Sequence, residues 1–135
     1  MRFLPLLLLL LLPSPVRAEL LFADAWIQNL PPSVPVRAGY VTVTNPDPQG
    51  VKIVGLRGDG FTRIEIHRSV MRDGEMHMEQ LPEVVIGAGE SLRFEPGGLH
   101  LMMYPLEPTR PGESYTIDIE LGDGSIRTIE MTVRK

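Results

Sequence analysis

The 135-residue sequence contains no cysteine. Disulfides are therefore excluded, and the fold must be held together by core packing, although small exported domains often rely on such cross-links. Thiolate metal ligands and a lipid-modified cysteine are excluded for the same reason. A blue-copper electron-transfer centre needs a cysteine thiolate, so that function is ruled out as well.

Basic residues and long apolar runs are also scarce. There are 13 basic and 17 acidic residues, for a formal net charge of −4. Nucleic acid partners are not expected, because phosphate backbones demand a basic surface. The one long apolar run, residues 3–12, has about half of the roughly 20 residues that a membrane-spanning helix needs.

The first eighteen residues are typical of an export signal. Arg2 precedes the apolar run, Pro13–Pro15 interrupts it, and Val16–Ala18 supplies small residues at the cleavage position. A membrane anchor is the alternative interpretation. We expect residues 1–18 to be a cleaved secretory signal peptide and residues 19–135 to be a single β-sandwich domain. The processed protein should be exported and soluble, without stable membrane insertion.

Residues 19–135 show no helical pattern but many short β-type segments separated by Gly, Pro, Asp and Asn. Apolar and polar residues alternate in 115–121, and Asp123–Gly124 predicts a two-residue hairpin turn to the last strand. Frequent strands and turns indicate an all-β sandwich or barrel. The predicted strands are 20–28, 39–45, 51–57, 61–68, 75–79, 83–86, 91–95, 99–104, 114–121 and 125–133.

All three histidines and most of the methionines lie in one window of the sequence, residues 67–103. Because side chains two apart on a strand point the same way, His100 and Met102 should share a face. Leu101 and Met103 should then face the core. The strand geometry therefore predicts that His100 and Met102 can reach one metal ion.

His67 and Met78 are the other candidates in this window. His67 should lie off the core face of strand 61–68, at the end of that strand. Met78 should share a face with Met76 on the predicted strand 75–79, while His77 points away from them. The alternative is that residues 76–78 form a mobile loop, in which His77 would be an extra copper contact. Isolated methionines are usually core residues. We therefore expect Met71, Met103 and Met131 to fill the core.

The types of the candidate ligand residues indicate which metal the site prefers. Thioether sulfur binds copper(I) well and zinc, calcium or magnesium poorly. Zinc would normally have thiolate or carboxylate beside its histidines. Two imidazoles with two thioethers, His67, His100, Met78 and Met102, therefore favour copper(I).

The spacing of these four residues, His-X10-Met-X21-His-X-Met, resembles the signature of the periplasmic copper chaperone family PCuAC. The segments Gly74–Met78, Pro96–Met103 and Ala38–Asn45 are also similar to that family. The resemblance covers essentially all of residues 19–135.

The resemblance implies a cupredoxin-like Greek-key β-sandwich that binds one copper(I) per chain and is not an enzyme. It also implies a periplasmic location and delivery of copper to cytochrome c oxidase assembly, either to a copper-accepting oxidase subunit or through a thiol-bearing assembly protein. Some relatives hold a further copper(II) on a His/Met-rich C-terminal tail. Residues 132–135 lack this composition, so no such copper(II) site is expected. We also expect the protein to be a monomer.

Three other functions are compatible with parts of the pattern. The same sandwich could be a non-metal adhesion or assembly module, which would bind no copper. It could instead be a general periplasmic copper buffer with no dedicated recipient. A zinc hydrolase using His67 and His100 is a weaker alternative, because a third ligand and a general base are missing.

Overall fold

The computed structural model describes residues 19–135, and the predicted signal peptide lies outside them. In the described part, strands and turns alternate and no helix occurs. All ten predicted strands are confirmed, most to within a few residues at each end. They are β1 (Leu21–Gln28), β2 (Arg37–Thr44), β3 (Val51–Arg57), β4 (Phe61–Arg72), β5 (Glu75–Leu81), β6 (Val84–Ile86), β7 (Ser91–Phe94), β8 (Leu99–Pro105), β9 (Ser114–Leu121) and β10 (Ile126–Arg134).

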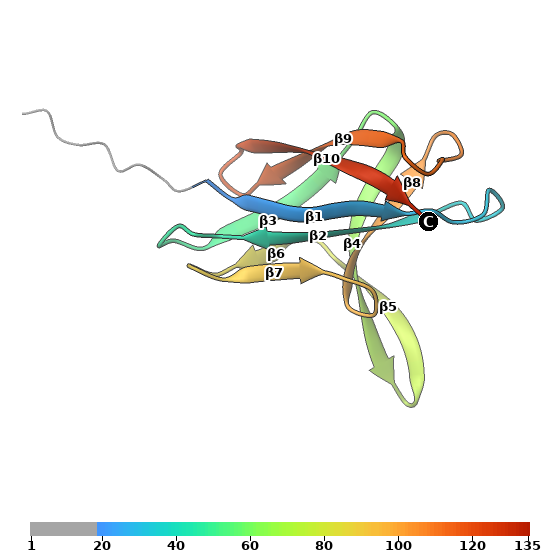
Figure 1. The fold of residues 1–135 in the computed structure, drawn as a ribbon. Coiled ribbons are helices and arrows are strands. Elements are labelled where there is room, and N and C mark those ends of the chain that lie inside the picture. Colours follow the sequence, from blue (N-terminus) through green and yellow to red (C-terminus); the bar gives the residue numbers. More distant parts are fainter. Residues whose placement is uncertain (1–18) are drawn as a thin grey trace, which may run out of the picture.

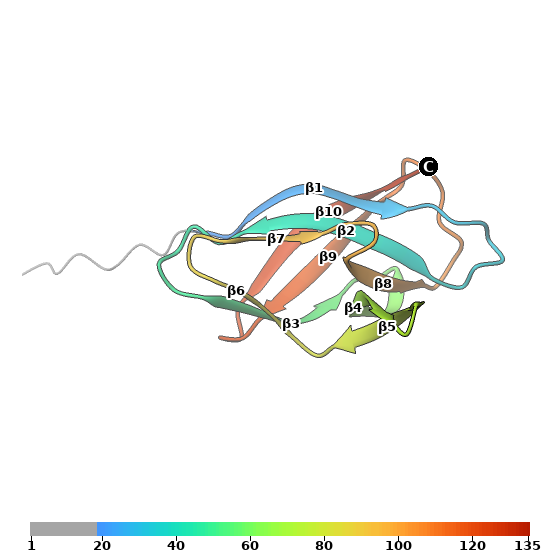
Figure 2. The ribbon, with the colours of Figure 1, turned by 90° about the horizontal axis from the view of Figure 1, so that it is seen from below.

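The strands form one sheet that closes on itself. The order is β5-β4-β8-β7-β2-β1-β10-β9-β3-β6, and β4 also pairs with β3 and β8 with β2. In Figure 2, β1, β2 and β7 lie in one layer and face β3, β4 and β6 in the other. The predicted single-domain, cupredoxin-like all-β sandwich is therefore confirmed.

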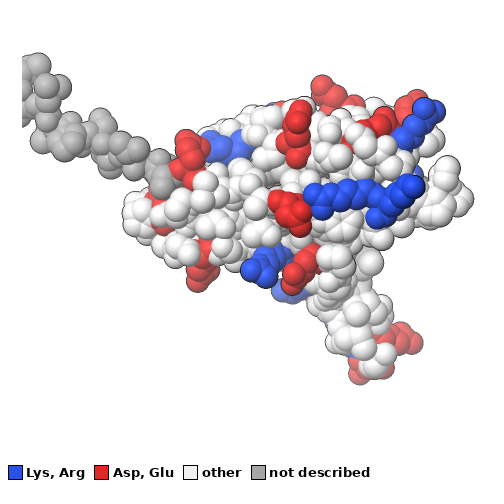
Figure 3. All heavy atoms as spheres, viewed as in Figure 1, with Lys and Arg blue, Asp and Glu red and all other residues white. Residues whose placement is uncertain are grey.

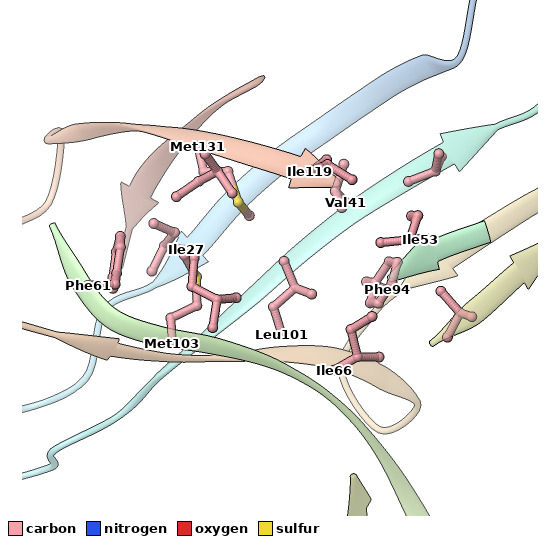
Figure 4. Close-up of a cluster of buried hydrophobic side chains, with 14 of the residues drawn as sticks. Ile27, Val41, Ile53, Phe61, Ile66, Phe94, Leu101, Met103, Ile119 and Met131 are labelled. Atoms are coloured by element: carbon pink, nitrogen blue, oxygen red, sulfur yellow. The ribbon is translucent and has the colours of Figure 1, made fainter. Parts of the chain in front are cut away.

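The core lies between these two layers. Alternate residues of β4 and β8 point into it: Ile64, Ile66, Leu101 and Met103 are all buried. Figure 4 shows Ile66, Leu101 and Met103 within the apolar cluster. Since neighbouring residues on a strand point to opposite faces, His67, His100 and Met102 lie on the outer face, as expected.

The β4–β5 hairpin extends beyond the sandwich. Residues Phe61 to Arg68 of β4 pair with β8, whereas the pairing with β5 continues to Arg72. Figure 1 shows the two strands projecting from the body as an arm. The prediction that His67 ends its strand is therefore wrong. It lies in mid-strand, because cross-strand bonds to β5 extend β4 past the edge of the core.

The β9–β10 connection is a hairpin, but its loop is longer than the sequence predicted. Leu121 donates its N–H to the carbonyl of Ser125 at 2.9 Å, which leaves a three-residue loop, Gly122–Gly124. Gly124 has a φ of +86°, the left-handed conformation that commonly completes such a loop. The expectation of a two-residue turn is thus wrong.

No helix long and apolar enough to cross a membrane occurs among residues 19–135.

Candidate metal centre

The centre is built around two histidines on neighbouring strands. His67 of β4 is directly paired with His100 of β8 in the antiparallel register. Their ring centroids lie 6.0 Å apart, with an angle of 37° between the ring planes. Directly opposed residues project from the same face of a sheet, so the two imidazoles stand side by side on the outer face.

The imidazole nitrogens of this pair are buried and largely without partners. Neither ring nitrogen of His67 makes a hydrogen bond to any described residue, and the same is true of Nε2 of His100. The Nδ1 of His100 lies 3.1 Å from the carbonyl oxygen of Gly98. That contact suits the tautomer in which Nδ1 donates, which leaves a lone pair on Nε2.

Met102 follows His100 on the same face of β8 and is partly buried. Its partner across the strands is Glu65 of β4. The Arg63 guanidinium donates a 2.9 Å hydrogen bond to Glu65, and this bond is the main cause of a lowered Glu65 pKa. The other carboxylate oxygen lies 3.6 Å from Nε2 of His67, which is too long for a hydrogen bond.

Met78 reaches the same face from β5. It is paired with Ser69, and the adjacent same-face pair is His67 with Gln80. Its side chain is 61% exposed. Met78 therefore lies diagonally next to His67 at the rim of the group, while the two histidines occupy its buried part.

The structure thus brings all four predicted residues to one face of three adjacent strands, β5, β4 and β8. Two come from β8 and one each from β4 and β5. No three His, Asp or Glu side chains of residues 19–135 are grouped in a way that could hold a metal. The imidazoles and thioethers of the four residues are together a donor set that suits a soft ion.

One expectation near the centre is wrong, and one alternative is excluded. Residues 76–78 belong to the predicted strand, β5, and not to a mobile loop, because β5 is paired with β4 along its whole length. Met71 is 63% exposed rather than a core residue. The alternation from His67 through Ser69 to Met71 would have placed it on the outer face, had β4 been predicted to its full length.

The expectations for Met103, Met131 and the orientation of His77 are confirmed. Met103 and Met131 are fully buried in the core. His77 points to the opposite face of the hairpin, since it is paired with Val70, and its Nε2 lies 3.7 Å from the Glu75 carboxylate.

Comparison with known families gives one match that covers almost the whole described chain. Residues 20–133 match the model of the family described as "Putative lipoprotein LpqE-like". A curated relative, "Putative lipoprotein Lxx21020" of Leifsonia xyli subsp. xyli, is 25% identical over 99 residues. The match covers 72% of the present chain and 60% of that relative, so the chain spans about three fifths of its length.

Solved structures with the same fold include copper-binding domains. The copper-bound PCuAC domain of PmoF2 superposes with a TM-score of 0.71 over 88% of this chain and 95% of that one, at 12% identity. The solution structure of copper(I)-bound DR1885 from Deinococcus radiodurans has a TM-score of 0.66 at 29% identity, over 82% and 75% of the two chains. The PmoF2 likeness shows the fold alone.

Proposed function

The chain belongs to the LpqE-like family, and from this premise and its donor set we propose that it is a periplasmic copper(I) carrier. The ion is held by His67, His100, Met78 and Met102, one per chain. The protein does no chemistry on the ion and is not an enzyme; copper is its cargo. The copper(I) bound to the similar DR1885 domain supports this choice of metal.

The observation that carries the proposal is the set of buried imidazole nitrogens without hydrogen bonds. His67 contributes both ring nitrogens and His100 contributes Nε2. A buried polar atom without a partner costs about 1–3 kcal/mol, so such atoms are rarely kept without a purpose. A metal ion that accepts the lone pair of one nitrogen from each ring removes that part of the penalty, and the adjacent thioethers select a soft, reduced ion.

The arrangement also suits release. All four donors are neutral, and Met78 stands at the exposed rim while His100 is buried. An incoming ligand can therefore replace Met78 first and reach the histidines last. We propose that the ion passes in this way to a copper-accepting oxidase subunit or a thiol-bearing assembly protein, with cytochrome c oxidase as the final recipient.

Copper(I) affinity of a methionine variant tests the proposal. In the double variant Met78→Leu/Met102→Leu, both sulfurs are lost while apolar volume is kept. Affinity, measured by anaerobic competition with a copper(I) chelator, should fall by at least about a hundredfold. The loss of a group that only hydrogen-bonds a metal ligand already lowers metal affinity by up to about that factor. Affinity equal to wild type would overturn the proposal.

Met103→Leu is the matched control. Met103 is next to Met102 in the sequence, but the Met103 side chain points into the core. An exchange of Met for Leu is well tolerated in a core. The copper affinity of this variant should stay at the wild-type level. X-ray absorption of the loaded wild-type protein should show two nitrogen and two sulfur scatterers; a shell of nitrogen and oxygen alone contradicts the site.

The same preparation separates the carrier from a non-metal assembly module. Copper(I) under reductant should raise the unfolding temperature of the carrier, because a ligand that binds only the native state stabilises it. Transfer of the ion to a purified acceptor, followed by metal analysis of both proteins, distinguishes a carrier from a copper buffer.

A further inference from the structure

Three methionines on the β4–β5 hairpin are exposed although methionine is an apolar residue. The exposed fractions are 63% for Met71, 59% for Met76 and 61% for Met78, whereas Met103 and Met131 are fully buried. Only Met78 belongs to the proposed copper centre. Core packing does not explain Met71 and Met76, because neither is in the core.

The strand register gathers these three side chains on one face. Met71 is directly paired with Met76, and Met78 is paired with Ser69. The Cβ atoms of directly paired residues lie about 5 Å apart, and those of residues two apart along a strand lie about 7 Å apart. The three thioethers can therefore converge, and Met78 also lies next to His67 on that face.

The opposite face of the same hairpin is charged. Glu79 lies 3.4 Å from the Arg68 guanidinium and 3.8 Å from that of Arg72, and Glu75 contacts His77. Figure 3 shows that the projecting arm is mainly uncharged on the visible side, with acidic atoms near its tip. The hairpin thus tolerates polar side chains, and the concentration of thioethers is confined to the face that leads to the histidines.

We propose that Met71, Met76 and Met78 form an outer entry site for copper(I), which captures the ion before it reaches His67 and His100. This inference rests on the proposed function and adds a second, weaker site. Thioether-only coordination suits copper(I) and excludes harder ions.

Transfer between the two sites is a ligand exchange around one shared donor. Met78 keeps its bond to the ion while the sulfurs of Met71 and Met76 leave. One imidazole nitrogen each from His67 and His100 and the sulfur of Met102 take their places. Copper stays in the +1 state throughout, and neutral imidazoles release no proton. The exposed end of the arm thus becomes the point of capture and the buried pair the point of storage.

Silver(I) is the probe, because it resembles copper(I) in its preference for thioethers and does not change oxidation state. The protein is labelled with ¹³C at the methionine methyl groups, which are assigned by single Met→Leu variants. In the His67→Leu/His100→Leu variant the inner site is lost. Silver(I) should still shift the methyl signals of Met71, Met76 and Met78, and those of Met103 and Met131 should not move and should report an intact core.

A loading experiment on the intact inner site gives a second readout. Met71→Leu/Met76→Leu should slow copper(I) uptake from a chelator by about threefold or more, because the arm no longer raises the local copper concentration. The matched control is His77→Gln, which removes a possible ligand from the other face of β5. Uptake by this control should match wild type.

The outcomes separate the two proposals. The entry site is overturned if excess silver(I) leaves the methyl signals of Met71 and Met76 unchanged both in wild type and in the histidine variant. The carrier function then still stands if wild type binds copper(I). A wild-type protein that binds neither ion overturns the carrier function and the entry site together. Should the histidine variant lose its fold, protection of Met71 and Met76 from peroxide oxidation by silver(I) in wild type decides the question.

Discussion

His67 and His100 are directly paired across β4 and β8, with ring centroids 6.0 Å apart and no hydrogen bond between the rings. Both rings are largely removed from solvent. An imidazole nitrogen in such a place loses its water without gaining a partner, which lowers stability. The pair therefore lowers the stability of the metal-free fold, and a metal ion bound to one nitrogen of each ring removes part of this loss.

The first prediction follows from this loss of stability. In the metal-free protein, His67→Leu should raise the free energy of unfolding by about 1 kcal/mol, since it removes two buried polar atoms without partners. The same variant should lose most of its copper(I) affinity. Urea denaturation of the metal-free protein and chelator competition measure the two effects.

His77→Leu is the control for this experiment. His77 is on the same hairpin but on its other face, and its side chain is 47% exposed. Neither stability nor affinity should change greatly. A loss of stability in His67→Leu of the metal-free protein would show that the His67 nitrogens have partners in solution.

The second prediction concerns the tautomer of His100. Its Nδ1 faces the Gly98 carbonyl at 3.1 Å, so this nitrogen should carry the proton in neutral imidazole. Long-range ¹H–¹⁵N NMR of the metal-free protein should report the Nδ1–H tautomer, and copper(I) or silver(I) should shift Nε2 far more than Nδ1. A dominant Nε2–H tautomer would contradict the proposed ligand atom.

The sequence predicted the strands and the faces of β8 well, because both depend on a local period of two. Leu101 and Met103 alternate with His100 and Met102, and the buried and outer faces follow from that alternation. The pairing of His67 with His100 depends instead on the register between β4 and β8. The register between strands that are distant in the sequence is set by tertiary packing. From the sequence, therefore, only the resemblance to PCuAC predicts that His67 and His100 lie close together.

The arm was missed for a related reason. Residues 69–72 of β4 have no core face, and an exposed two-stranded extension lacks the apolar alternation by which strands are found. The sequence predicts a buried Met71, because isolated methionines usually pack in the core. Its exposure became evident only with the full length of β4 and its pairing with Met76.

The third prediction concerns pH. The hydrogen bond from Arg63 lowers the pKa of Glu65 from its ordinary value of 4.5. A carboxylate whose pKa is lower in the folded state adds stability above its unfolded pKa, and this stability is lost as pH falls through the folded pKa. Replacement by Glu65→Gln removes the contribution. The metal-free variant should therefore be less stable than wild type near neutral pH, and the difference should shrink below about pH 4.5.

Urea denaturation of both proteins between about pH 3 and pH 7 measures this difference. Arg63→Gln is the matched variant, since it removes the donor rather than the acceptor of the 2.9 Å bond. It should flatten the pH dependence in the same way. A stability difference that is constant over this pH range would show that Glu65 and Arg63 are not coupled in solution.

The fourth prediction tests whether the arm positions Met78. Asp73 and Gly74 form the two-residue turn of the β4–β5 hairpin, with φ values of +51° and +78°. Gly74→Ala should destabilise the hairpin by about 1 kcal/mol, because a residue with a side chain disfavours a positive φ. The cost should be local, since a Cβ at Gly74 would meet no atom within 4 Å. If the hairpin frays by that amount, copper(I) affinity should fall by up to about fivefold.

Gly124→Ala provides a closely matched control. Gly124 has a φ of +86° in the β9–β10 loop, and its Cβ would also meet no atom within 4 Å. The backbone penalty is thus similar, but the loop does not connect strands that carry the copper ligands. Hydrogen exchange should quicken in β5 for Gly74→Ala and at the β9–β10 turn for Gly124→Ala, with lower copper affinity only in the first. Equal losses of affinity in both variants would mean that general stability, rather than the position of Met78, governs binding.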